Sequence, residues 1–95
     1  AAASDASNLI IKQTFTLTTS VSLNSLASAS YDVTVTAPSG YKAVAALEGR
    51  VVGGLFAVTV NLIDSTTARA YVINASSSTR TGTGVTVDVL FIRDI

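Results

Sequence analysis

The chain contains 95 residues, with six basic and six acidic side chains and no cysteine, histidine, tryptophan or methionine. This composition excludes disulfides and thiolate metal sites, removes the commonest general base, and leaves no basic patch to neutralise nucleic-acid phosphates. The longest apolar run has nine residues, whereas a membrane-spanning helix needs about 20, so we expect no membrane insertion.

The first half of the chain is predicted to form three strands. Over the whole sequence, serine and threonine supply 25 residues and valine 12, a composition that favours strands. Residues 1–8 are small and polar and are interpreted as a linker or frayed end, which leaves one domain over residues 9–95. Leu9–Leu23 and Tyr31–Thr36 alternate apolar with polar residues, which predicts strands with one wet face. After a Pro-Ser-Gly turn, Tyr41–Leu47 fits a helical turn as well as a strand, and we interpret it as a strand that a Glu-Gly-Arg segment interrupts.

The second half contains the most apolar run, Leu55–Ile63, which we interpret as the element around which the other strands are arranged. Ala68–Asn74 and Val85–Arg93 predict two further strands, joined by a polar loop over Ala75–Gly84. Six or seven short strands separated by turns predict an all-β domain, a small antiparallel β-barrel or sandwich.

Contact between copies of the chain is expected from the two faces of Leu55–Ile63. Its even-numbered residues form one apolar face, which we assign to the core. Its odd-numbered residues include Leu55, Ala57 and Ile63, more apolar surface than a single barrel of this size can hide. We therefore expect neighbouring subunits to cover part of this second face.

No catalytic motif is evident. The hydroxyl groups have no histidine to activate them, and neither a phosphate-binding loop nor a carboxylate cluster is present in the sequence. Asp32 and Asp88 lie on the polar side of their strands and are expected to face solvent. A glycoside hydrolase would need both carboxylates in one cleft, so we expect no enzymatic activity and no cofactor.

Two short motifs suggest a ligand or a modification. Asp64–Thr66 offers oxygen atoms to a calcium ion, but such turns are common without metal, and we expect no metal site. Asn74–Ser76 is an acceptor sequence for N-glycosylation, which matters only in a chain secreted by a eukaryote.

A saccharide-binding pair is suggested by Arg69 and Tyr71, which share one side of their strand. The phenol ring offers a stacking plane, and the guanidinium is a forked donor for hydroxyl or phosphate oxygens. The alternative is that Tyr71 belongs to the core or a subunit interface while Arg69 extends from it to water. Arg80 in the polar loop and Tyr41 beside the proline turn are weaker candidates for the same site.

The order of strand and turn patterns resembles a known family. The segments that carry this resemblance are KQTFTLTTSVSL, SYDVTVTAPSGYKAVAALEG, VNLIDSTTARAYVINASSS and VTVDVLFIRD. Together they resemble the C-terminal domain of tail-fibre and receptor-binding proteins of bacteriophages infecting Gram-positive bacteria, including the head domains of lactococcal phage receptor-binding proteins. The resemblance covers residues 13–95 and rests on strand and turn patterns without a catalytic signature.

This resemblance implies a small β-barrel that forms a homotrimer at the distal end of the phage tail, on the virion, and binds a cell-wall saccharide of the host. Some such head domains hold sugar with tryptophan and histidine, which this chain lacks, so those positions cannot be transferred. The candidates that remain for saccharide binding are Arg69, Tyr71, Arg80, Tyr41 and Asp64. The alternative function is an immunoglobulin-like structural module of a bacterial surface protein, which we expect to be monomeric and to bind no sugar.

Overall fold

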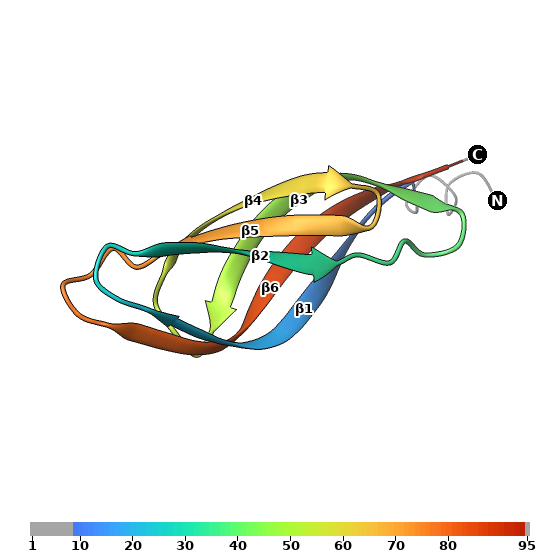
Figure 1. Ribbon diagram of the computed structural model, residues 1–95. Helices are drawn as coiled ribbons and strands as arrows, with labels where there is room; N and C mark the ends of the chain where they lie inside the picture. Colours follow the sequence, from blue (N-terminus) through green and yellow to red (C-terminus); the bar gives the residue numbers. More distant parts are fainter. Residues whose placement is uncertain (1–8, 95) are drawn as a thin grey trace.

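The computed structural model describes residues 9–94, which form six antiparallel strands and no helix (Figure 1). The expected linker over residues 1–8 lies outside the described residues. No helix long and apolar enough to cross a membrane occurs in the part that is described. The strands are β1 (Ile10–Leu23), β2 (Ser28–Thr34), β3 (Tyr41–Val52), β4 (Ala57–Asp64), β5 (Thr67–Ile73) and β6 (Arg80–Arg93).

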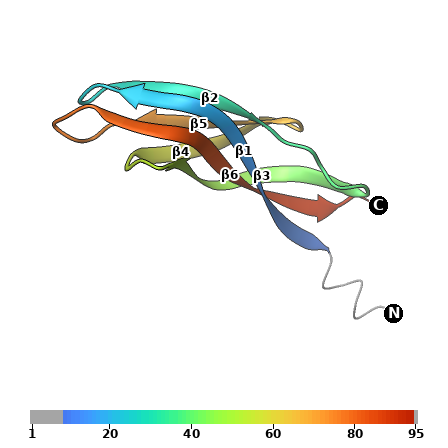
Figure 2. The ribbon, with the colours of Figure 1, turned by 90° about the horizontal axis from the view of Figure 1, so that it is seen from below.

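The strands form two three-stranded sheets, ordered β1-β6-β3 and β2-β5-β4, which pack face to face (Figures 1 and 2). Only β4 and β5 are consecutive strands within one sheet, and each of the other connections crosses between the sheets. The arrangement resembles a jelly roll with fewer strands. The expected sandwich is confirmed, whereas the barrel is wrong, because within residues 9–94 no strand ladder joins one sheet to the other.

The core lies between the sheets and is centred on β5 and β6. The inward side chains of these two strands are fully buried, and Phe15 packs edge-on against Phe91 with ring centroids 6.0 Å apart. Leu55–Ile63 is therefore not the central element. Its even-numbered residues do pack against the core, as predicted, but β4 is an edge strand, and Leu55 precedes it with 77% of its surface exposed.

Two stretches expected to be irregular continue as strand. The Glu-Gly-Arg segment lies inside β3, where two β-bulges leave Val44 and Leu47 exposed and bend the edge of the sheet. Residues 80–84 begin β6, because Gly82 and Gly84 allow the backbones of three strands to approach closely. A Cβ atom on Gly82 would lie 2.9 Å from the carbonyl oxygen of Val52, and one on Gly84 would lie 3.0 Å from that of Leu17. Gly82 and Gly84 therefore allow close strand packing and do not mark a loop.

The molecule is elongated, with extents of 55 × 21 × 17 Å, and its two ends differ. The chain enters at Leu9 and leaves at Asp94 at one end, where the Arg93 amide donates to the Leu9 carbonyl (2.9 Å). At the other end, three connections lie together: residues 24–27, 53–56 and 74–79 (Figure 1). We call these two ends the terminal end and the loop end.

Candidate functional site

Side chains on the exposed side of the β2-β5-β4 sheet form rows across the strands, and we call the nine side chains in the three rows nearest the loop end the outer face. Strand register places these residues side by side, each row crossing all three strands. Eight of the nine are exposed, and the arginine is half-buried. The rows are Asp32, Arg69 and Asn61; Ser30, Tyr71 and Thr59; and Ser28, Ile73 and Ala57, with the last row nearest the loop end.

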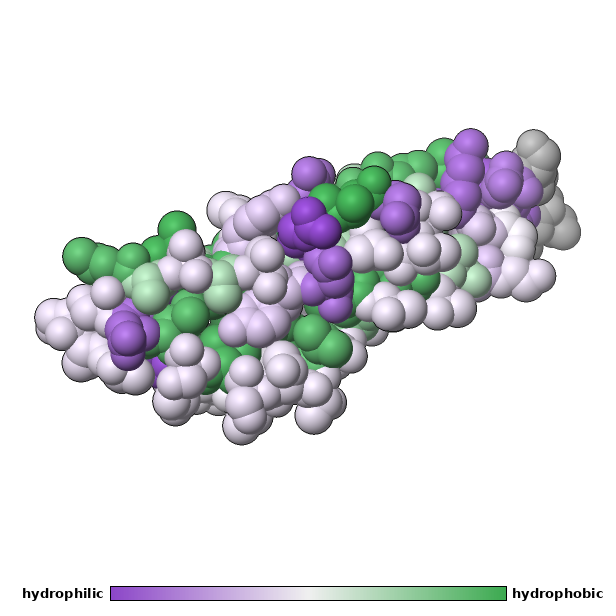
Figure 3. All heavy atoms as spheres, viewed as in Figure 1, coloured by the Kyte–Doolittle hydropathy of each residue, from purple (hydrophilic) through white to green (hydrophobic). Residues whose placement is uncertain are grey.

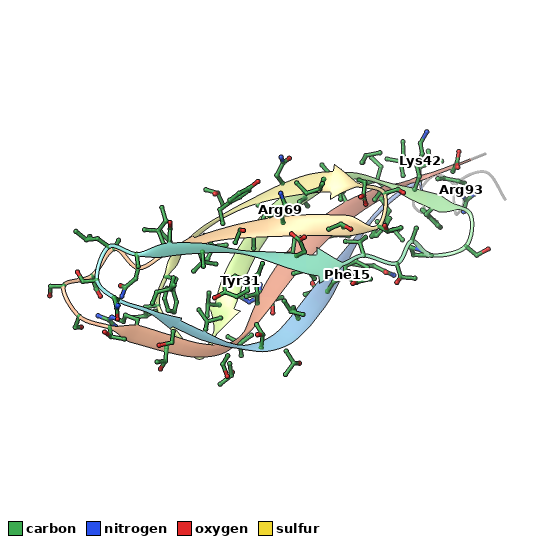
Figure 4. All side chains as sticks on the ribbon, viewed as in Figure 1. Phe15, Tyr31, Lys42, Arg69 and Arg93 are labelled. Atoms are coloured by element: carbon green, nitrogen blue, oxygen red, sulfur yellow. The ribbon has the colours of Figure 1, made fainter. Side chains whose placement is uncertain are left out.

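An ion pair crosses the outer face between β2 and β5. Arg69 Nε donates to Asp32 Oδ1 at 2.7 Å, and Arg69 Nη2 donates to Asp32 Oδ2 at 3.3 Å. The hydrogen bond from Arg69 lowers the pKa of Asp32, and the same bond, together with the neighbouring Tyr71 phenol, raises the pKa of Arg69. Asp32 faces solvent as predicted, and Figure 4 shows Arg69 midway along the sandwich. The Asp32–Arg69 ion pair thus forms the charged row next to the row of Tyr71.

Tyr71 stands on the outer face with 41% of its surface exposed, so it does not belong to the core. Its ring borders an open depression of about 380 Å³ between β2 and β5. The depression combines a phenol, serine hydroxyls and an aliphatic wall, and its lining residues are Ser28, Ala29, Ser30, Tyr71, Val72 and Ile73. This combination suits a pyranose ring, which has an apolar face and hydroxyl groups at its edge.

A second open depression, also about 380 Å³, lies at the loop end beside the last row of the outer face. Ala57 belongs to both surfaces, because it lines this depression and pairs with Ile73 across the sheet. Arg80 contributes the one charged group, and the remaining lining residues are Leu55, Phe56, Ala75 and Ser76. Figure 3 shows apolar atoms exposed at this end of the molecule and also along the upper edge of the view.

The loops around the second depression are held by Asn74, which is fully buried. Its Nδ2 group donates to the carbonyl oxygens of Leu23 and Ser78, each at 2.8 Å. Its Oδ1 atom accepts from the amide nitrogen of Ser76 (3.0 Å) and from the hydroxyl of Ser76 (2.6 Å). All hydrogen-bonding capacity of the amide is used inside the protein, so the glycosylation sequence presents no accessible amide in the folded chain.

Two of the candidate saccharide-binding residues lie away from Tyr71. Tyr41 begins β3 at the terminal end, where the guanidinium carbon of Arg93 lies 5.8 Å from its ring centroid. The Asp64 carboxylate accepts hydrogen bonds from the amide (2.9 Å) and the hydroxyl (3.1 Å) of Thr66. These bonds lower the pKa of Asp64, and the bond from the backbone amide has the larger effect. The structure therefore places Arg69 and Tyr71 side by side and puts Arg80 at the adjoining depression. Asp64 lies in the row beyond Arg69, on the side opposite to Tyr71, and only Tyr41 lies at the terminal end.

Asp88 is buried, contrary to the prediction that it faces solvent. It lies at the centre of the β1-β6-β3 sheet, and only 6% of its side chain is exposed. Thr14 donates to its Oδ1 atom at 2.6 Å, and Lys12 lies 4.0 Å from Oδ2. Asp32 lies on the other sheet and faces the opposite way, so these two carboxylates cannot share a catalytic cleft.

Ser28, Ser30 and Ile73 were not predicted to belong to a binding site. Ser28 and Ser30 alternate with inward residues on β2, and Ile73 shares the parity of Tyr71, so each pattern was visible. Their adjacency was not visible, because it depends on the register between β2 and β5.

Within residues 9–94 no three acidic side chains gather where a metal ion could be held. Comparisons of this chain with protein-family models, curated proteins and solved structures found no match.

Proposed function

We propose that this chain is a non-enzymatic saccharide-binding module, used as the receptor-binding head of a bacteriophage tail. The observation that carries the proposal is the exposed Tyr71 ring on the outer face, with Ser30 and Thr59 beside it in the same row. A pyranose stacked on the ring can exchange hydrogen bonds with a hydroxyl on either side. The phage context is supported by the resemblance of the strand and turn patterns.

The dimensions of the outer face suit a short oligosaccharide. Neighbouring strands are ~4.8 Å apart and alternate residues along a strand are ~6.6 Å apart, so the three rows cover ~10 by ~13 Å. The pairing of Arg69 with Asp32 limits the rotamers of both side chains before any ligand arrives. Less conformational entropy is then lost on binding, which favours recognition by a surface that has only one aromatic ring.

Assembly as a homotrimer is part of the proposal, and exposed apolar groups support it. Leu55 and Ile63 are 77% and 41% exposed, and Ala57 is exposed between them. A second subunit that covered Ile63, at the end of β4 away from the loop-end depression, would remove apolar surface from water and leave Leu55 and Ala57 open to a ligand. Three weak sites on one tail tip would then bind a repetitive cell wall far more tightly than one site does.

The experiment is a glycan array followed by calorimetric titration of the best ligand. We expect Tyr71→Ala to weaken binding about tenfold or more, which corresponds to ~1.4 kcal/mol of lost stacking, and Tyr71→Phe to retain most of the affinity. Leu47→Ala is the control, because this side chain is 48% exposed on the other sheet. Equal affinities of the wild type and Tyr71→Ala would contradict the proposed site.

The immunoglobulin-like alternative makes opposite predictions. Immunoglobulin domains pair several consecutive strands within one sheet, whereas here only β4 and β5 do so, and the strand order thus differs from that of an immunoglobulin domain. Light scattering at micromolar concentration separates the two. A trimer that binds a glycan supports the head domain, and a monomer that binds none supports the structural module.

A further inference from the structure

We propose that the depression at the loop end is an oxyanion subsite, in which Arg80 binds a carboxylate or phosphate group carried by the saccharide. This inference rests on the proposed function, because it names the class of saccharide that the outer face and the adjoining depression would select together. Ala57 connects the two surfaces, since it lines the depression and pairs with Ile73 next to the Tyr71 row.

The Arg80 side chain is held by hydrogen bonds that begin at a buried group. Asn74 Oδ1 accepts from the Ser76 hydroxyl at 2.6 Å, and the Ser76 oxygen in turn accepts from Arg80 Nε at 3.2 Å. The Nε contact occupies one of the five guanidinium donors. Within residues 9–94 the Nη atoms have no hydrogen-bond partner. Their paired edge has the geometry that binds a carboxylate or phosphate through two parallel hydrogen bonds.

The charge at this end of the molecule is not balanced. No charged residue occurs in the three loops 24–27, 53–56 and 74–79, and the nearest charges along the chain from Arg80 are Arg69 and Asp88. Both of these belong to ion pairs on the sheets. In the described part of the chain Arg80 therefore has no carboxylate partner, and a ligand anion would supply one.

The walls of the depression strengthen such a contact. Leu55, Phe56 and Ala75 line the depression together with Arg80. Apolar side chains beside the guanidinium displace part of the surrounding water, so an ion pair formed there is screened less than one on a fully polar surface. The apolar body of a sugar ring also finds van der Waals contact against the same walls.

The test uses galacturonic acid, galactose 1-phosphate and neutral galactose as probes, with the side-chain Nε–H resonance of Arg80 as the NMR readout. We expect saturable shifts with at least one of the two anions and none with galactose, and the two anions distinguish a carboxylate from a phosphate ligand. Arg80→Gln should weaken anion binding at least tenfold, and Arg80→Lys should weaken it less. Lys42→Gln is the matched control, because it removes the same charge at the terminal end (Figure 4).

Combination with Tyr71→Ala separates this inference from the proposed function. A saturable shift of Arg80 in the Tyr71→Ala variant supports the anion subsite even if the tyrosine binds no sugar. Equal binding of galactose and galacturonic acid by the wild type and Arg80→Gln overturns the subsite and leaves the tyrosine site standing. The absence of a saturable shift with both anions also overturns it.

Discussion

Replacement of Asn74 by alanine tests whether one buried amide holds the loop end together. The substitution removes the donors to the Leu23 and Ser78 carbonyl oxygens and the acceptor for two groups of Ser76. A neutral hydrogen bond contributes ~1 kcal/mol net, and a buried group left without its partner costs ~1–3 kcal/mol. Water can reach Ser76 and Ser78 but not the buried Leu23, so we expect a loss of ~2–4 kcal/mol in the free energy of unfolding.

Equilibrium unfolding in urea measures this loss, with Ser77→Ala as the control because Ser77 is an exposed residue of the same loop. For a domain of this size each 1 kcal/mol also corresponds to ~4–8 °C in melting temperature. Asn74→Asp should be destabilised at neutral pH, where its carboxylate would face two carbonyl oxygens. It should recover as the pH falls and the group is protonated. A midpoint for Asn74→Ala equal to that of Ser77→Ala would refute the reasoning.

Three further predictions concern the sheets and the first turn. Gly82→Ala should lower the free energy of unfolding by ~1–3 kcal/mol, because its Cβ would overlap Val51, and an unchanged urea midpoint would contradict this close packing. The hydrogen bond from Thr14, aided by nearby cations, lowers the pKa of Asp88. Stability from this group should thus be present at neutral pH and lost on acidification below about pH 4, and a Thr14→Val variant with the same pH dependence would contradict the assignment. Leu26 has a φ of 62° and is 76% exposed, so Leu26→Gly should raise the unfolding free energy by up to ~1 kcal/mol, whereas a decrease would show that the leucine side chain stabilises the turn.

The class of fold was predictable from local patterns. Alternation of apolar and polar residues has the period of a strand, and it assigned the inward face of β4 correctly. Turn chemistry is equally local: Gly40 closes the predicted Pro-Ser-Gly turn, and its φ of 84° is a value that glycine adopts without strain. These features depend on a few adjacent residues, so they can be derived before any partner strand is known.

Neighbours across the sheets were not predictable, because strand pairing joins residues that are far apart along the chain. Asp88 follows the same alternating pattern as Asp32, yet it is buried because β6 lies between β1 and β3, while Asp32 is exposed on the opposite sheet. Likewise, Arg69 and Tyr71 are visible as a pair in the sequence, but their neighbours on β2 and β4 follow from the register. Alternation identifies the face of a strand on which a residue lies, and long-range pairing determines what covers that face.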